Sequence, residues 1–291
     1  MEGLILRGIG SFYTVLADDG EYYTLRAQKK LRRMGTVPTV GDRVSMIPPS
    51  QSEEGWIESI LPRKNLLKRP PVANIDLIAA VIAPVPEPDL LLLERLILQA
   101  RTVNAVPMIC VNKTDMGKEL LDRMLLEFRN SEIPVYGVST VTGEGIHELR
   151  KCLEGKIVCF AGQSAVGKSS LINALTGSLL ETSGISRKTQ RGRHTTRRCE
   201  LIGIGKGYLA DTPGFSLFEL KEDLLPEELG AHYPEYSALE NECRFHPCFH
   251  DREPGCAVRK AVEMGTLSQE RLERYRLLLN EAKENRKGRY S

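Results

Sequence analysis

Short alternations of apolar and polar residues fill the first 68 residues of the chain. Their period of two is typical of strands with one buried face. Asp18-Asp19-Gly20 is a hairpin-turn sequence, and Gly41 lies in a second turn. The clearest alternating runs are residues 13–17, 22–26, 43–47 and 56–60. About five short strands in this segment predict a small closed β-barrel. An oligonucleotide-binding (OB) fold is the leading candidate among several small barrels.

From residue 69 to residue 220, longer apolar strands alternate with helical periods. This alternation predicts a mostly parallel sheet covered by helices on both faces. Ligands of such sheets bind beyond the carboxyl ends of the strands, where the motifs described below fall. The predicted strands are residues 76–82, 107–111, 135–138, 156–161 and 208–210, and the predicted helices are residues 89–101, 118–130, 145–153 and 170–175.

The last segment combines a cysteine–histidine cluster with a helical stretch over residues 266–283. The changes of pattern near residues 68 and 220 predict three domains. Length also favours two or three, since 291 residues exceed a typical single domain. The predicted domains are a barrel over residues 1–68, an α/β domain over residues 69–220 and a C-terminal domain over residues 221–291.

Composition is that of a soluble globular protein, with 41% hydrophobic and 27% charged residues. A net charge of +2 is too small to indicate nucleic acid by itself. Two local basic runs, residues 29–33 and 187–198, fit either solvated loops or contact with RNA phosphates.

The compartment is predicted from the absence of targeting signals and from the cysteines. The start of the chain lacks the apolar run of a secretion signal, and no stretch is long enough to span a membrane. Four of the seven cysteines stand singly: Cys110, Cys152, Cys159 and Cys199. We therefore expect a reduced, cytoplasmic protein without a membrane partner.

The segment after the predicted strand 156–161 matches the phosphate-binding pattern GxxxxGK[ST]. Its glycines let successive backbone N–H groups point at phosphates at the start of a helix. Lys168 would neutralise the β- and γ-phosphates, and the Ser169 hydroxyl would ligate magnesium. A coincidental glycine-rich turn is the alternative, which the strand–loop–helix context disfavours. The predicted nucleotide-binding residues here are Gly162, Gln163, Ser164, Ala165, Val166, Gly167, Lys168, Ser169 and Ser170.

Asn112, Lys113 and Asp115 form an Asn-Lys-x-Asp motif at the end of a predicted strand. The Asp115 carboxylate can accept hydrogen bonds from guanine N1–H and N2–H₂, whereas adenine would present an unpaired acceptor. The Lys113 stem can pack on the base, and Asn112 can brace the neighbouring loop. Ser139 and Thr140, after the next predicted strand, are predicted to offer a backbone N–H to guanine O6. A polar turn is the alternative, but beside a phosphate loop the motif predicts GTP and GDP as ligands.

Asp211 and Gly214 begin and end an Asp-x-x-Gly string 43 residues after Lys168, a plausible spacing for a GTPase. Asp211 would hold a magnesium-bound water, and the Gly214 amide would contact the γ-phosphate. Thr195 or Thr196, which lie between the two motifs, would complete the magnesium shell.

Phe215 follows Gly214, where many GTPases carry the glutamine that orients the attacking water. An apolar side chain cannot orient water. We therefore expect slow intrinsic hydrolysis, with the water placed by His194 or by a partner. The alternative for His194 is a solvated loop histidine. The predicted catalytic set is Lys168, His194, Thr195, Thr196, Asp211 and Gly214.

The motifs run in a permuted order, because the guanine motif at Asp115 precedes the phosphate loop that usually comes first. Permutation joins the old termini and cuts one connection, so the sheet can still form. The chain leaves this domain just after Gly214. We therefore expect contact with the γ-phosphate to move the C-terminal domain.

Three cysteines and one histidine lie within 14 residues: Cys243, Cys248, His250 and Cys256. Three thiolates and one imidazole match a closed, structural Cys₃His zinc site, which leaves no position open for catalysis. His246 is an alternative ligand to His250, and free thiols are the alternative to a metal. A zinc-stapled module this small needs its metal to fold.

With these motifs in hand, the chain resembles the circularly permuted, ribosome-associated GTPases of the RsgA or YjeQ family over essentially its whole length. The resemblance implies an N-terminal OB-fold barrel, a central α/β P-loop GTPase domain of permuted motif order, and a C-terminal, mainly helical zinc-binding domain. It rests on this order of segments: the barrel, residues 112–115, 162–169, 192–196 and 211–214, and the cysteine–histidine cluster.

The resemblance also implies partners: the small ribosomal subunit and its rRNA, with a late role in maturation of that subunit. It implies subunit-stimulated GTP hydrolysis with magnesium in the bacterial cytoplasm, and we expect a monomer. Two rivals are an RNA-binding module that uses GTP only structurally and a regulatory GTPase of membranes or signalling. The presence of Lys168 and Asp211 disfavours the first. The absence of a lipidation signal disfavours the second.

Overall fold

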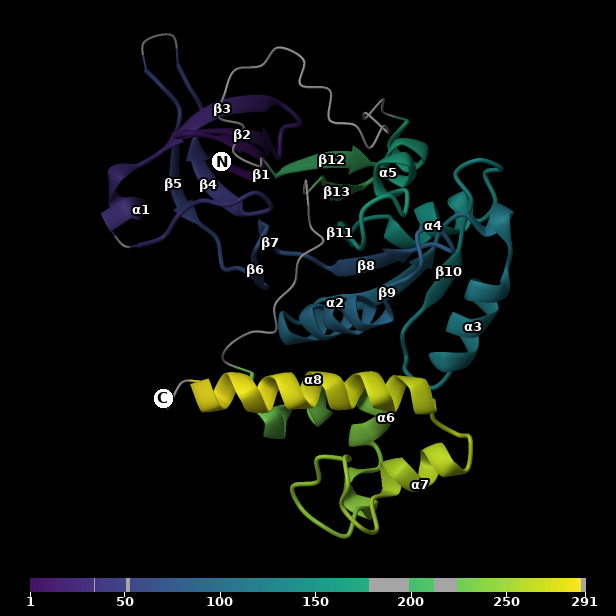
Figure 1. The fold of residues 1–291 in the computed structure, drawn as a ribbon. Coiled ribbons are helices and arrows are strands. Elements are labelled where there is room, and N and C mark those ends of the chain that lie inside the picture. Colours follow the sequence, from purple (N-terminus) through teal and green to yellow (C-terminus); the bar gives the residue numbers. More distant parts are fainter. Residues whose placement is uncertain (34, 51–52, 178–198, 212–223, 289–291) are drawn as a thin grey trace.

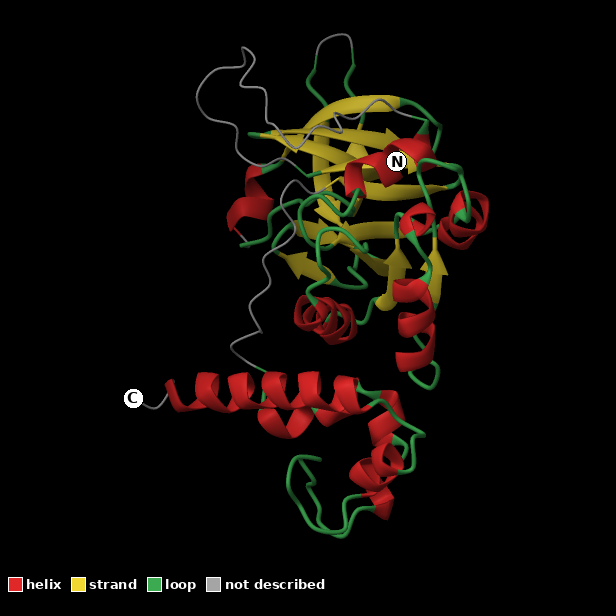
Figure 2. Cartoon of the chain, turned by 45° about the vertical axis from the view of Figure 1, so that its right-hand side comes forward, coloured by secondary structure: helices red, strands yellow, loops and turns green. Residues whose placement is uncertain are grey.

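A computed structural model describes residues 1–33, 35–50, 53–177, 199–211 and 224–288 of the chain. Its parts are a β-barrel that includes the N-terminus, a central sheet flanked by helices, and a helical C-terminal part (Figure 1). Figure 2 shows the strands gathered in the first two parts, while the C-terminal part consists of helices and loops. Among the described residues, no helix is both long and apolar enough to cross a membrane.

Five strands close the N-terminal barrel. β1 pairs with β2 and β4, β2 pairs with β3, and β5 completes the ring by pairing with β3 and β4. Only the β3–β5 pair is parallel. The predicted barrel is therefore confirmed, with the strand count of an OB fold. Its elements are β1 (Glu2–Ile9), β2 (Phe12–Ala17), β3 (Tyr22–Ala27), α1 (Lys29–Arg33), β4 (Arg43–Ile47) and β5 (Trp56–Ile60).

The alternation of apolar and polar residues does not predict β1, because both faces of this strand are covered. Ile5 belongs to the core of the barrel. Its neighbour Leu6 belongs to the core beneath the central sheet. The consecutive apolar residues of β1 thus serve two cores, and the period-two signal is lost.

The central sheet has the strand order β10-β9-β8-β11-β13-β12. All neighbours are parallel except β12, which pairs antiparallel with β13. Helices α2 and α3 pack on one face, and α4 and α5 pack on the other, as the sequence predicts. The elements are β8 (Leu77–Ile82), α2 (Leu90–Thr102), β9 (Val106–Val111), α3 (Glu119–Glu127), β10 (Val135–Gly137), α4 (Ile146–Leu153), β11 (Ile157–Ala161), α5 (Lys168–Thr176), β12 (Glu200–Ile204) and β13 (Gly207–Asp211).

The barrel and the central sheet are joined edge to edge. β1 pairs antiparallel with β12 at Arg7 and Glu200, so the two parts form one eleven-stranded sheet. A short hairpin, β6 (Leu66–Lys68) and β7 (Pro71–Ala73), lies between them in the chain. Neither this hairpin nor the β1–β12 pairing is predicted from the sequence.

The C-terminal part contains a long helix that packs against α2 (Figure 1). The predicted helix 266–283 is confirmed as this helix, α8 (Gln269–Gly288). Tyr233, Tyr236 and Tyr275 fill the core of this part together with the cysteines of the cluster. The remaining elements are α6 (Pro234–Ser237), α7 (Ala257–Glu263) and the short 3₁₀ turns Pro226–Glu228, Gly230–His232 and Glu240–Glu242.

A buried group of charges attaches the C-terminal part to the central domain. Glu94 on α2 is fully buried and receives Arg271 Nε at 3.1 Å and Arg274 Nη2 at 3.3 Å, both from α8. Arg274 also reaches Glu127 of α3 at 2.6 Å, and Arg271 pairs with Glu235 of α6. We call these five residues the interdomain charge cluster.

Replacing Glu94 with Gln is expected to destabilise the docking of α8 strongly. The amide keeps the side-chain volume but leaves two buried guanidinium groups without their shared carboxylate. Removing one partner of a buried ion pair typically costs about 3–5 kcal/mol. We expect a loss of that size in the free energy of unfolding measured by urea denaturation.

The matched control is Glu281→Gln, which removes the partner of Arg95 between the same two helices. That pair is about a quarter exposed, so its loss should cost less than about 1 kcal/mol. Equal effects of the two substitutions would show that burial of the charge cluster does not stabilise the interface.

Candidate nucleotide and metal sites

The phosphate loop lies between the end of β11 and the start of α5, and neither of its two glycines can be replaced without strain. Gly162 has a φ of 141°, and a Cβ there would lie 2.2 Å from the Val81 carbonyl oxygen. Gly167 has a φ of 95°, and its Cβ would lie 2.3 Å from Asn112 Nδ2. Backbone approach this close requires glycine at both positions. The loop is therefore held against β8 and the guanine motif at either end.

Lys168 curls back over the phosphate loop. Its ammonium donates to the carbonyl oxygen of Gly162 at 2.7 Å and also to that of Gln163. Burial lowers the pKa of Lys168, because the charged form loses solvation there. A phosphate group beside this nitrogen would favour the charged form again. Ser164, Ala165 and Ser169 are exposed around it.

The Gln163 side chain holds the start of α2. Its Oε1 accepts the backbone N–H of Asp89 at 2.9 Å, and its Nε2 donates to the Glu87 carbonyl oxygen at 3.1 Å. Asp89 in turn caps α2 by accepting from the Leu92 N–H at 2.8 Å. Because both polar atoms of its side chain are engaged, Gln163 would contact a nucleotide through its backbone.

The guanine motif braces the phosphate loop directly. Asn112 is buried, and its Nδ2 donates to the Val166 carbonyl oxygen at 2.9 Å. Lys113 Nζ donates to the carbonyl oxygens of Ala165 at 2.8 Å and Val85 at 2.7 Å. Asn112 and Lys113 thus fix the phosphate loop relative to β9. This matches the bracing expected of Asn112.

The Ser139 hydroxyl group orients Asp115. The sequence predicted only a backbone contact for Ser139. Ser139 Oγ donates to Asp115 Oδ1 at 2.5 Å. The same oxygen accepts the backbone N–H groups of Thr142 at 3.1 Å and Val141 at 3.2 Å. These two donors direct the Ser139 proton at the carboxylate. Thr140 lies half-buried in the turn between Ser139 and Val141.

Asp211 is the last residue of β13, and its neighbour Ala210 pairs with Cys159 of β11. The side chain therefore lies at the same sheet edge as the phosphate loop. Burial raises the pKa of Asp211, and the nearby Glu200 adds to this shift. A cation at this position would reverse both effects. The predicted residues His194, Thr195, Thr196 and Gly214, together with Phe215 and the whole basic run 187–198, lie outside the described residues.

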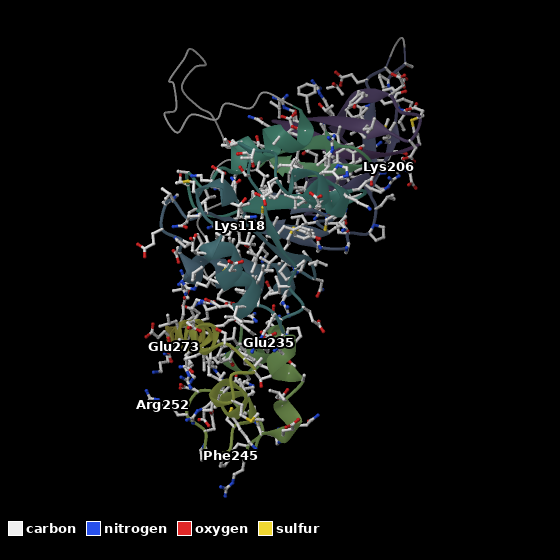
Figure 3. All side chains as sticks on the ribbon, turned by 90° about the vertical axis from the view of Figure 1, so that its right-hand side faces the viewer. Lys118, Lys206, Glu235, Phe245, Arg252 and Glu273 are labelled. Atoms are coloured by element: carbon white, nitrogen blue, oxygen red, sulfur yellow. The ribbon has the colours of Figure 1, made fainter. Side chains whose placement is uncertain are left out.

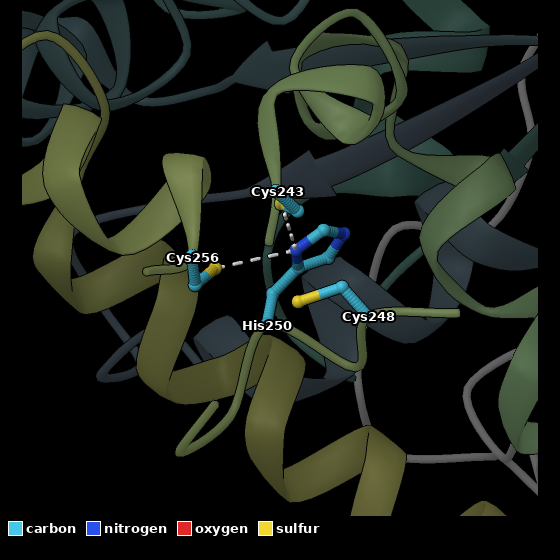
Figure 4. Close-up of side chains that lie close together, drawn as sticks. All are labelled: Cys243, Cys248, His250 and Cys256. Carbon is cyan, nitrogen blue, oxygen red and sulfur yellow. Dashed lines mark hydrogen bonds between the residues drawn. The ribbon is translucent and has the colours of Figure 1, made fainter. Parts of the chain in front are cut away.

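The cysteine–histidine cluster forms in the loop between the last 3₁₀ turn and α7 (Figure 4). One ligand atom from each of the four residues lies within 4.8 Å of the others. His250 Nδ1 is 3.8 Å from Cys243 Sγ and 3.5 Å from Cys256 Sγ. All four side chains are buried, whereas His246 is exposed and outside the group.

This arrangement fits a tetrahedral zinc ion. Zinc bonds of about 2.3 Å to sulfur and 2.0–2.1 Å to nitrogen imply ligand–ligand edges of roughly 3.5–3.8 Å. The distances from His250 to two cysteines match these edges. Four protein ligands would complete the shell, as expected of a structural site rather than a catalytic one.

The ends of four strands bring these motifs to one edge of the central sheet, although the guanine motif precedes the phosphate loop in the chain. This fold and site define a circularly permuted GTPase of the P-loop type. The sequence pattern described as RsgA GTPase matches residues 60–221, and that of the RsgA N-terminal domain matches residues 2–57. The chain belongs to the RsgA GTPase family and is a GTP hydrolase.

Similar proteins cover the chain from end to end. A protein of Caldanaerobacter subterraneus, named small ribosomal subunit biogenesis GTPase RsgA, is 42% identical over 294 residues, covering 100% of this chain and 98% of its own. A protein of the same name from a Geobacillus species is 42% identical over 99% of each chain. The crystal structure of YjeQ from Thermotoga maritima has a TM-score of 0.81 and 32% identity, covering 97% of this chain and 98% of its own. YloQ, described as a circularly permuted GTPase, has the same score and identity.

Proposed function

We propose that this GTPase binds the small ribosomal subunit, assists its late maturation, and hydrolyses GTP to GDP and phosphate faster when bound to it. The observation that carries this proposal is the joining of an OB-type barrel to the strand next to Asp211. RNA contact at the barrel therefore has a short path to the catalytic edge. The names of the full-length relatives supply the identity of the partner.

In the proposed site, the backbone N–H groups of residues 162–169 and the Lys168 ammonium hold the phosphates. Asp115, oriented by Ser139, reads the guanine edge. Ser169 would ligate magnesium and Asp211 would hold a magnesium-bound water, and the ion neutralises phosphate charge when bound. The catalytic roles of His194, Thr195, Thr196 and Gly214 complete the proposal. Water placement would come from His194 or the partner, since Phe215 cannot orient water.

The remaining assignments are also proposals. Cys243, Cys248, His250 and Cys256 would bind one structural zinc ion. We retain the domain division at residues 68 and 220, a monomeric state, rRNA as the contacted component, and a cytoplasmic location.

The test is GTP turnover with magnesium, measured alone and with purified small subunits, with ATP as the control. We expect slow basal turnover of GTP and stimulation of at least about 10-fold. A partner-supplied group gives other GTPases about 10³–10⁵-fold. Lys168→Ala should remove both rates. GTP turnover that ignores the subunit would overturn the ribosomal part of the proposal. Binding of GTP without any turnover would favour an RNA-binding module that uses GTP structurally.

A further inference from the structure

A groove of about 490 Å³ separates the outer face of the barrel from the β12–β13 hairpin. Its volume is within the range of about 300–1,000 Å³ found for small-molecule sites. Strands β1, β2 and β3 form one wall, and the hairpin forms the other. We call it the seam groove and define it by Arg7, Thr14, Tyr22, Glu200, Gly203 and Tyr208.

Two tyrosines flank the seam groove from opposite walls. Tyr22 opens β3 and is 66% exposed. Tyr208 projects from β13 and is half-buried. Burial raises the pKa of Tyr208, and both tyrosines line the same groove. The groove thus has aromatic surface on both sides.

The floor and the polar edge of the groove also suit a flat ligand. Gly203 contributes no side chain, and a Cβ built there meets no heavy atom within 4 Å. Arg7 and Glu200 face each other across the seam, with Nε and Oε2 3.6 Å apart. They offer N–H donors and carboxylate acceptors at one edge, and their charges cancel. A neutral, planar group with donors and acceptors fits better than a phosphate.

We propose, resting on the function proposed above, that the seam groove seats one unstacked base of single-stranded RNA between Tyr22 and Tyr208. Bases removed from a stack bind proteins by stacking on aromatic rings and by hydrogen bonds to their edges. OB barrels use the face of strands 2 and 3 for such ligands, and Thr14 and Tyr22 lie on those strands. Lys206, exposed in the hairpin turn beside the barrel (Figure 3), can take a backbone phosphate.

Binding of a base in the seam groove connects RNA binding to the catalytic edge of the central sheet. Glu200 is the cross-strand partner of Asp211 in the β12–β13 hairpin. It also pairs with Arg7 of the barrel. A base that hydrogen-bonds Arg7 or Glu200 therefore contacts the ion pair that lies directly opposite Asp211, the residue proposed to hold a magnesium-bound water. This is a route by which the partner stimulates hydrolysis.

The first test measures binding of a fluorescein-labelled, ten-nucleotide single-stranded RNA to the full-length protein at fixed salt. Stacking on one ring is worth about 1–3 kcal/mol, so Tyr22→Ala should weaken binding roughly 5- to 150-fold, while Tyr22→Phe keeps the ring and most of the affinity. Gly203→Val adds a side chain to the groove at a position where a Cβ meets no heavy atom within 4 Å, and it should weaken binding similarly. Phe245→Ala is the matched control, since Phe245 is a 44% exposed aromatic residue of the C-terminal part, outside the groove and outside the barrel. An equal loss for Phe245→Ala would overturn the placement.

The second test maps contacts and turnover. A 4-thiouridine-substituted RNA should crosslink to peptides containing Tyr22 or Tyr208, and crosslinks confined to other parts of the barrel would overturn the proposal.

Gly203→Val should reduce turnover stimulated by small subunits and keep basal turnover. Full stimulation of Tyr22→Ala and Gly203→Val would exclude the groove but leave the proposed function intact. Absence of stimulation in the wild type would instead exclude the proposed function. A third outcome is that Tyr22→Ala and Gly203→Val lose binding to the subunit although the wild type does not bind free RNA. That outcome would identify a ribosomal protein segment as the occupant of the groove.

Discussion

Removing the proposed zinc ion from the Cys243, Cys248, His250 and Cys256 cluster is expected to unfold the loop that carries it, along with α7, while the barrel and central sheet stay folded. Three of these residues belong to the hydrophobic core of the C-terminal part. Cys256 precedes α7, and Cys243 Sγ accepts the Ala257 N–H at 3.4 Å. Structural zinc contributes about 10–16 kcal/mol of apparent binding free energy in small modules.

The measurement is hydrogen exchange by residue segment before and after chelation, with zinc content determined by mass spectrometry of the native protein. Protection should fall in the segments spanning residues 243–263 and persist in β8 and β9. Cys256→Ser should reproduce the effect without a chelator. Cys152→Ser is the matched control, because Cys152 is a thiol on α4 outside the cluster. One zinc per chain with unchanged protection after its removal would contradict a structural role.

The catalytic edge was predictable because its motifs have local signals. A phosphate loop needs glycine at fixed spacing, and strand ends at residues 111 and 161 follow from apolar runs. The structure adds what spacing cannot encode. The Ser139 hydroxyl orients Asp115, and Gln163 holds Asp89 instead of facing outward. Both depend on side-chain direction in loops, which a one-dimensional pattern does not specify.

The long-range contacts were not predictable for a different reason. Glu94 interrupts an apolar helix and resembles a solvent-facing residue, yet Arg271 and Arg274, some 180 positions later, bury it. The β1–β12 pairing likewise joins residues nearly 200 positions apart. His250 and His246 are equivalent by spacing, and only the fold of their loop selects His250. The sequence predicts which chemistry is present more readily than which segments meet.

Replacing Asp115 with Asn is expected to change the preferred nucleotide from GTP to xanthosine triphosphate. The carboxylate presents only acceptors to the guanine N1–H and N2–H₂ donors. The Asn side-chain amide replaces one carboxylate oxygen with an N–H donor. This donor matches the ring carbonyl that xanthine carries in place of the guanine amino group. Sites that hydrogen-bond a substrate reject mismatched analogues by up to about 10⁴–10⁵-fold. We expect GTP affinity to fall by roughly 10³-fold, with turnover of the xanthine nucleotide retained.

The measurement is competition of GTP, xanthosine triphosphate and ATP for the nucleotide site, followed by turnover of each. Asp122→Asn, an exposed carboxylate on α3, is the matched control for loss of one charge and should leave the preference unchanged. Ser139→Ala removes only the hydroxyl that orients Asp115. It should weaken GTP binding about 10-fold, as a hydrogen bond to a charged group is worth about 1.5–3 kcal/mol, without admitting xanthine. If Asp115→Asn weakened all three nucleotides equally, Asp115 would support the loop and another group would read the base.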